Sequence, residues 1–155
     1  MTNAIEAKLA EKGLVLPEAT LPAANYVPYT IVGNQVVISG QLPMKDGKPQ
    51  GIGKLGREFT VEQGQEIAVQ CTLNVLAHLR AALGGDLTRV TKIARLGIFV
   101  ASAEGFTDQP KVANGASDLI VELFGDKGKH ARAAVGVAEL PFGVGVEVEA
   151  LVEFA

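Results

Sequence analysis

Hydrophobic positions recur along the chain with two different spacings, and each spacing predicts one kind of secondary structure. A period of 3.6 residues over residues 60–83 predicts a long helix. Thr60 and Gln63 match the capping-box pattern that begins a helix, and Gly84-Gly85 is typical of a helix end. A short helix is expected over residues 3–12, where the apolar positions share one face.

The same helical spacing predicts a second long helix over residues 108–124. Asp108 is expected to cap it, and Pro110 suits its first turn, where an N–H donor is not needed. Asn114-Gly115 lies inside this pattern, although Asn-Gly is more typical of a hairpin turn. A glycine within a helix costs about 1 kcal/mol relative to alanine. Three explanations remain open: a close approach by another segment, a need for a polar amide, or a tolerated surface pair.

Alternation of apolar and polar residues predicts strands elsewhere in the chain. The expected strands cover residues 29–32, 35–39, 90–100, 131–138 and 144–154. In the last of these, the valines, Ala150 and Phe154 point to one face, and Glu147, Glu149 and Glu153 to the other. The order ββ-α-β-α-ββ predicts an α+β fold with both long helices on one face of the sheet. Residues 44–58 are glycine-rich and are expected to form a flexible surface loop.

Composition narrows the class of protein. The chain has 155 residues, of which 48% are hydrophobic and 20% charged, so it fits one folded domain and excludes intrinsic disorder. The net charge of −3, without a basic cluster, speaks against binding to nucleic acid. One cysteine and two histidines favour neither a disulfide nor a metal site. No membrane-spanning segment or signal peptide is found, so we expect a soluble cytoplasmic protein.

Two motifs suggest chemistry but favour a structural interpretation. Residues 51–56 match G-x-G-x-x-G, yet no strand leads directly into them and the predicted helix begins later, so we interpret them as a loop. Cys71 and His78 are seven residues apart on the long helix, where a buried, inert thiol is the expected state of Cys71. His130, next to a lysine, is expected to be a solvated loop residue.

Arg132 lies in a strand whose other residues are small and apolar. An unpaired buried charge is very costly, so the guanidinium must either have a partner or face a cleft. One interpretation is a structural ion pair with Glu147 or Glu149 from the final strand. The other is that the guanidinium binds the carboxylate of a ligand through two parallel hydrogen bonds.

Several stretches together carry a resemblance to a known family. They are Pro28-Tyr29, Ser39-Gly40-Gln41-Leu42-Pro43, Asn114 in the second long helix, and Ala131-Arg132-Ala133-Ala134-Val135 continuing through Leu140-Pro141 to Glu147-Val148-Glu149-Ala150. Over residues 24–154 they resemble the RidA/YjgF family, also catalogued as endoribonuclease L-PSP. The expected division is an N-terminal helix and extended lead-in over residues 1–23 and a single RidA/YjgF-like domain over residues 24–155. The longer N-terminus and residues 51–64 resemble one branch of this family.

The resemblance implies a chorismate-mutase-like fold assembled as a homotrimer, with sheets inside, helices outside and a cleft between each pair of neighbouring subunits. It also implies hydrolysis of reactive 2-imino or enamino acids to 2-keto acids and ammonia, without a cofactor or metal. By motif position, Arg132 would bind the substrate carboxylate and Glu147 would hold the attacking water. The residues that would line the cleft are Tyr29, Ser39, Gly40, Asn114 and Ala134. Ala134 stands where many members have cysteine.

Three functions are compatible with these residues. A protonated imine is already electrophilic, so its hydrolysis needs positioning and charge stabilisation more than a strong nucleophile. This suits a chain without a nucleophile triad or metal cluster, and it makes an imine deaminase the first hypothesis. The second is a non-catalytic trimer that senses small carboxylate metabolites in the same clefts. The third is a ribonuclease, which the acidic composition disfavours.

Overall fold

The computed structural model of the chain describes residues 3–19 and 25–155. Its helices are α1 (Ala4–Glu11), α2 (Val61–Ala82) and α3 (Gln109–Phe124), with short 3-10 segments at η1 (Leu87–Arg89), η2 (Gly125–Gly128) and η3 (Pro141–Gly143). Its strands are β1 (Tyr29–Val32), β2 (Gln35–Gln41), β3 (Met44–Lys45), β4 (Lys48–Pro49), β5 (Val90–Ala101), β6 (Ala131–Val137) and β7 (Val146–Phe154). The helices and long strands therefore lie where the residue spacing predicts them.

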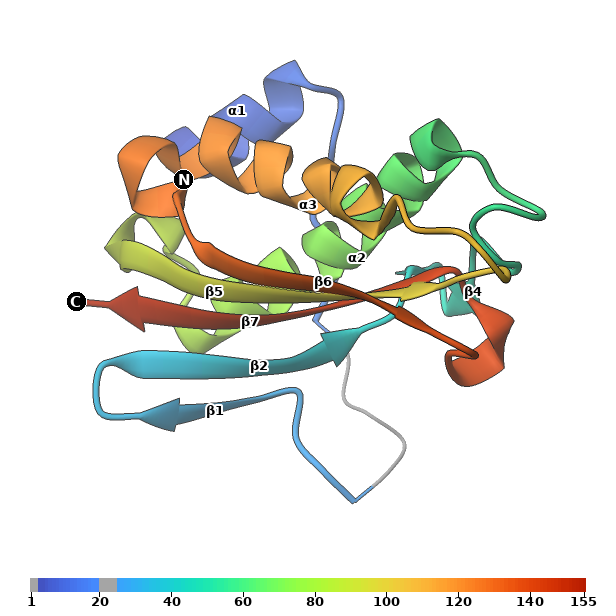
Figure 1. Ribbon diagram of the computed structural model, residues 1–155. Coiled ribbons are helices and arrows are strands. Elements are labelled where there is room, and N and C mark those ends of the chain that lie inside the picture. The colour runs from blue at the N-terminus through green and yellow to red at the C-terminus, as the bar shows by residue number, and fades with distance from the viewer. Residues whose placement is uncertain (1–2, 20–24) are drawn as a thin grey trace.

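The main sheet has the strand order β1-β2-β7-β5-β6. Neighbouring strands are antiparallel except β5 and β6, which are parallel and are joined through α3. Figure 1 shows α1, α2 and α3 on the same side of the sheet, with β1 and β6 as its two edges. The predicted α+β class, with both long helices on one face, is confirmed. The short helix α1 joins the same layer, packed against α3 and η1.

The alternation in β7 places its valines in the core. Val146, Val148 and Val152 are at most 1% exposed, whereas Glu147 and Glu149 are half-buried on the opposite face. That opposite face, called here the bare face, is covered by no element of the described chain. Apolar side chains on it are left partly exposed: 46% for Val135 and 41% for Val37.

Both long helices begin near the predicted residues, but only one has the predicted cap. Thr60 Oγ1 accepts a hydrogen bond from the Gln63 N–H (3.2 Å), and Gln63 Oε1 accepts one from the Thr60 N–H (2.9 Å), which confirms the capping box. The expected cap at Asp108 is wrong: its side chain makes no capping hydrogen bond. Its backbone, with ψ of 28°, lacks the extended conformation that directs a cap side chain to the N–H groups of the first turn.

The glycine inside α3 allows α3 to approach α2 closely. A Cβ atom built on Gly115 would lie 2.8 Å from the Gln65 Cα and closer still to the carbonyl oxygen of that residue. Gln65 Nε2 also donates to the Lys111 carbonyl (2.8 Å), so the two helices are bonded at the same place. The first explanation for Asn114-Gly115, close approach by another segment, is therefore correct for the glycine.

The expectation of a flexible loop over residues 44–58 is wrong. Its first part is the β3–β4 hairpin, and the rest is hydrogen-bonded to the end of the sheet. Leu55 is fully buried, and its N–H donates to the Ala101 carbonyl (2.9 Å). The Gly53 N–H donates to the Gly143 carbonyl (2.9 Å). Here the glycines provide positive φ angles and close contacts, so their number did not indicate mobility. Helix α2 begins only after this segment, which agrees with the loop interpretation of the G-x-G-x-x-G pattern.

Candidate active site

Arg132 lies on the edge strand β6 and its side chain reaches α3. Nη1 donates to Asn114 Oδ1 (2.8 Å) and to Ser117 Oγ (3.1 Å), and Nη2 donates to the Pro110 carbonyl (3.4 Å). The proposed ion pair of Arg132 with a glutamate of β7 is therefore wrong. Glu149 instead pairs with Arg95 (3.2 Å) on the bare face, whereas Arg132 points to the helix side. Asn114 supplies the polar amide that its position in α3 suggested.

These contacts leave one edge of the Arg132 guanidinium free. The group has five N–H donors, and three of them are directed to the acceptors on α3. Within residues 3–19 and 25–155, no acceptor meets Nε or the second N–H of Nη2. These two donors are parallel and match the two oxygens of a carboxylate. Because Arg132 is exposed, this free edge is open to a ligand.

His130 is not the solvated loop residue that its position suggested. Its ring is half-buried, with Nδ1 2.6 Å from the Gly128 carbonyl and Nε2 2.9 Å from Ser117 Oγ. Neither Ser117 nor His130 had been assigned to the site. Their spacing could have indicated a place in the site. Ser117 lies three residues after Asn114 on the same helix face, and His130 lies two residues before Arg132 along an extended segment.

Ala134 belongs to the same side of β6 as Arg132. The two residues are paired with Ile98 and Leu96 of β5, both of which belong to the core. Ala134 packs partly buried against that core and carries only a methyl group. At this position the chain therefore offers a ligand its backbone groups and a small apolar surface, and no thiol.

Glu147 and Gly40 form a second cluster, on the bare face. A Cβ atom built on Gly40 would lie 2.9 Å from the Glu147 Cδ and closer still to its carboxylate oxygen, so the carboxylate lies directly over the Gly40 backbone. Burial raises the pKa of Glu147, and the nearby charge of Glu149 raises it further. A carboxylate with a raised pKa is a stronger base than an ordinary glutamate.

Ser39 adjoins Gly40 in β2, whereas Tyr29 begins the neighbouring strand β1 and faces the helix side of the sheet. Ser39 Oγ donates to the Val27 carbonyl (2.7 Å), and the Ser39 N–H donates to the Pro28 carbonyl (2.9 Å). These bonds hold the start of β1 against β2. Tyr29 is paired with Ile38 in the register of the two strands, and its ring packs partly buried against the core.

The predicted site residues thus fall into two groups that one chain does not bring together. One group, on α3 and β6, contains Asn114, Arg132 and Ala134. The other, on β1, β2 and β7, contains Tyr29, Ser39, Gly40 and Glu147. Arg132 and Glu147 extend from opposite faces of the sheet, two strands apart, which is about 10 Å along the sheet. Tyr29 is on the opposite edge strand from Arg132, about 19 Å away at roughly 4.8 Å per strand.

The remaining ionisable core residues do not form a site. Cys71 is fully buried, its thiol donates to the Val146 carbonyl (3.3 Å), and burial raises its pKa. The predicted burial of the Cys71 thiol is confirmed. His78 is 5% exposed and its Nδ1 has no hydrogen-bond partner in the described chain, while the Cys71 thiol is bonded to Val146 and not to His78. No group of three or more metal-ligating side chains is present in residues 3–19 and 25–155.

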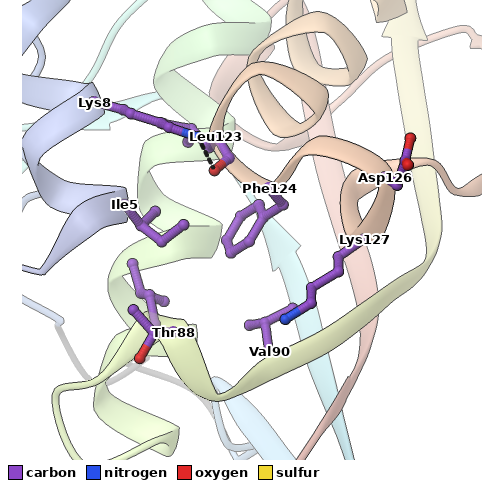
Figure 2. A pocket seen from close by; sticks show the side chains of 9 residues that line it. Ile5, Lys8, Thr88, Val90, Leu123, Phe124, Asp126 and Lys127 are labelled. Carbon is purple, nitrogen blue, oxygen red and sulfur yellow. Dashed lines mark hydrogen bonds between the residues drawn. The ribbon is translucent and has the colours of Figure 1, made fainter.

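A surface hollow between α1, α3 and η1 has a volume of about 420 Å³. Figure 2 shows Ile5 and the Phe124 ring facing each other across it, with Lys127 reaching towards Val90. Lys8 lies along its rim and donates to the Leu123 carbonyl (3.4 Å). Its lining is mostly apolar and contains none of the residues of the two groups, so we place the candidate site elsewhere.

The fold and these two groups define an α+β protein with an exposed arginine, two of whose parallel donors are free in the described chain, at one sheet edge and a glutamate of raised pKa on a bare sheet face. Residues 6–151 match the family described as "YjgF/chorismate_mutase-like, putative endoribonuclease", and the chain belongs to this family. No helix of the described ranges has both the length and the apolar character needed to cross a membrane.

Individual relatives span nearly the whole chain. Protein TCP17 of Trypanosoma cruzi is 51% identical over 96% of this chain and 93% of its own. A 2-iminobutanoate/2-iminopropanoate deaminase of Dermatophagoides farinae is 31% identical over 88% of this chain and 91% of its own. The crystal structure of Atu1372 from Agrobacterium tumefaciens, a protein of unknown function, is 47% identical, with a TM-score of 0.94 over 99% of this chain and 94% of that one.

Proposed function

We propose that the protein hydrolyses 2-imino or enamino acids to 2-keto acids and ammonia in clefts shared by two subunits. The observation that carries this proposal is the free, parallel pair of N–H donors on Arg132, which matches a substrate carboxylate. The similarity to a 2-iminobutanoate/2-iminopropanoate deaminase supports the same chemistry. A net charge of −3 and glutamates on the bare face speak against a ribonuclease.

In the proposed reaction, Arg132 binds the carboxylate and so fixes the plane of the imine next to it. Glu147 accepts a proton from water while the water oxygen bonds to the imine carbon, and the C=N π electrons move to nitrogen. The protonated Glu147 returns this proton to the amino group of the resulting tetrahedral adduct, and ammonia leaves with the electron pair of the C–N bond. A lone pair of the remaining hydroxyl oxygen forms the C=O bond, and the hydroxyl proton passes to the Glu147 carboxylate or to the departing ammonia. Positioning and a base of raised pKa are enough for these steps, because a protonated imine is itself electrophilic.

The proposal requires at least two copies of the chain. Arg132 and Glu147 extend from opposite faces of one sheet, so a small substrate cannot contact both within one chain. The bare face, with its exposed valines, is a surface on which a second copy would bury apolar area. We therefore propose a homotrimer in which each cleft combines Arg132 of one subunit with Glu147 of its neighbour.

Complementation between two inactive variants tests this arrangement. Arg132→Ala and Glu147→Gln chains are each expected to lack deaminase activity on freshly generated 2-iminobutanoate, measured as 2-oxobutanoate release. Co-expressed in equal amounts, they form mixed trimers in which some clefts receive an intact Arg132 and an intact Glu147. Random assembly makes that fraction about one quarter, so activity should return to about a quarter of the wild-type value.

Each other outcome contradicts one part of the proposal. Inactive mixed trimers, with each parent chain also inactive, would show that both groups act within one subunit. Activity retained by the Arg132→Ala chain alone would exclude the carboxylate-binding role. A wild-type protein that binds 2-oxobutanoate but releases none from 2-iminobutanoate would favour the sensor and exclude the deaminase.

A further inference from the structure

We propose that Ser117 and His130 are positioning residues that hold Arg132 ready for the substrate carboxylate. This inference rests on the proposed function, because it concerns the same arginine. Without Ser117, Arg132 would keep only the Asn114 acceptor on Nη1 and the longer contact of Nη2 with the Pro110 carbonyl (3.4 Å), and an exposed arginine held by these two alone keeps more of its rotational freedom. Ser117 supplies the second acceptor on Nη1, and His130 fixes Ser117.

The direction of each hydrogen bond in this chain follows from the chemistry of its ends. The Gly128 carbonyl only accepts, so His130 Nδ1 carries the proton across their 2.6 Å contact. In the neutral ring, Nε2 then accepts a hydrogen bond from the Ser117 hydroxyl across 2.9 Å. The lone pairs of Ser117 Oγ therefore face Arg132, whose Nη1 donates across 3.1 Å.

His130 is itself held by a tightly packed turn. Gly128 is buried in η2, and a Cβ atom built on it would lie 3.1 Å from the Ile120 carbonyl carbon of α3. The carbonyl that accepts from His130 therefore belongs to backbone packed against the same helix that carries Ser117. The hydrogen bonds run from this turn through His130 and Ser117 to Arg132. His130 and Ser117 each have one hydrogen bond to the residue before them in this series and one to the residue after them.

The consequence for Arg132 is a defined orientation. Both N–H groups of Nη1 are engaged, one by Asn114 and one by Ser117, so rotation of the guanidinium would break both of these bonds together with the contact of Nη2 with Pro110. The unengaged donors on Nε and Nη2 then stay on the exposed edge. A preorganised fork binds a carboxylate without first losing rotamer entropy.

The test compares Ser117→Ala and His130→Ala with the wild type in steady-state hydrolysis of 2-iminobutanoate and in 2-oxobutanoate binding by calorimetry. Because Arg132 binds the carboxylate before and during the reaction, its loosening should raise KM and Kd on the order of tenfold and leave kcat within about threefold. Because His130 acts through Ser117, the double variant should be no worse than either single variant. Ser117→Thr and His130→Gln keep an acceptor at each position and should restore most of the affinity.

Ser102→Ala is the matched control. Ser102 is a half-buried serine whose hydroxyl also makes two hydrogen bonds, but to the Val100 carbonyl and from Gln109. Its removal should leave KM unchanged. Wild-type affinity in Ser117→Ala and His130→Ala, while Arg132→Ala is inactive, would overturn the positioning role and leave the deaminase proposal standing. A loss of kcat by orders of magnitude at unchanged KM in Ser117→Ala would also overturn it, because that result indicates a nucleophilic serine. Additive losses in the double variant would show two independent roles.

Discussion

At the scale of single residues, Arg132 is exposed yet hydrogen-bonded to α3. Replacing it should therefore reduce activity without reducing the stability of the fold. Arg132→Lys should keep the fold but lose about 100-fold in rate, because an ammonium is a point charge that cannot fix the plane of the carboxylate. Arg132→Ala should lose binding of 2-oxobutanoate. Deaminase rate and thermal unfolding are measured on both variants.

The melting temperature of each Arg132 variant decides between a ligand-binding and a structural role. It should stay within a few degrees of the wild type, because an exposed arginine without a buried ionic partner contributes little to stability. A large decrease, or full activity in Arg132→Ala, would contradict the ligand-binding role.

The raised pKa of Glu147 predicts that activity and stability change in opposite directions with pH. Its folded pKa is raised, so the folded state binds a proton more readily than the unfolded state does. Stability should therefore be highest at low pH within this window and fall as pH rises from the unfolded pKa through the raised folded pKa. Deaminase activity should rise over the same window, because the base must lose its proton.

Glu147→Gln isolates this carboxylate. The variant should be inactive, yet should unfold at the same or a higher temperature than the wild type at pH 7, since the desolvated charge is gone. Chemical denaturation across pH 4 to 7 should also become flatter. Destabilisation of Glu147→Gln at pH 7, or activity equal to that of the wild type, would contradict the assignment.

At the scale of elements, the contact between α2 and α3 depends on the missing side chain of Gly115. Gly115→Ala places a Cβ against the Gln65 backbone, which cannot move aside as a flexible side chain can. We expect a loss of about 2 kcal/mol or more in the free energy of unfolding by urea, as for overpacked cores. Because α3 carries Asn114, affinity for 2-oxobutanoate should also decrease.

Gly84→Ala is the comparison for this substitution. Gly84 has a φ of +68° and open space around its Cβ position, so alanine there meets backbone strain without a clash. It should cost about 1 kcal/mol. Equal losses at the two glycines would mean that the α2–α3 contact has relaxed and that Gly115 is not needed for close packing.

Local patterns predicted the elements because each long helix and strand buries one face. The spacing between Leu76 and Leu79 in the helix, and between Val146 and Val148 in the strand, results directly from that burial. Residues 44–58 were mispredicted because glycines that serve tight turns and close contacts have the same composition as glycines in a mobile loop. The parallel pairing of β5 with β6 also cannot be predicted from a local sequence pattern, because it depends on the crossover through α3.

The site was less predictable than the fold, for a related reason. Arg132 stood out because a charge among small apolar residues needs a partner. Its partner could not be read from charge alone: glutamates of β7 looked suitable, but they extend from the other face of the sheet. Ser117 and His130 are ordinary polar residues, and only the packing of α3 on β6 gives them a shared role.

At the scale of the whole molecule, the bare face predicts association. Sedimentation equilibrium at micromolar concentration should give the mass of three chains, and the melting temperature should rise with protein concentration, since association stabilises the folded state by mass action. Val135→Lys, at a position that is 46% exposed on the bare face, should shift the protein to monomers and abolish activity. Ala7→Lys, on the exposed side of α1, is the control and should change neither.

A well-behaved wild-type monomer at micromolar concentration would contradict both the trimer and the shared cleft. A trimer that survives Val135→Lys unchanged would place the subunit interface elsewhere. Activity in a monomeric Val135→Lys protein would show that one chain is sufficient for catalysis.

The groups proposed to position the carboxylate come from one uninterrupted stretch, from Pro110 in α3 to Arg132 in β6. The residues proposed to hold the water, Gly40 and Glu147, are instead distant from each other in sequence. A recombination event with both ends outside residues 110–132 would therefore move the whole proposed carboxylate-binding segment between homologous chains. Chimeras that exchange this stretch should keep recognition of the acid group while the rest of the chain determines which side chain is accepted. Protein engineers can accordingly vary the two halves in separate libraries.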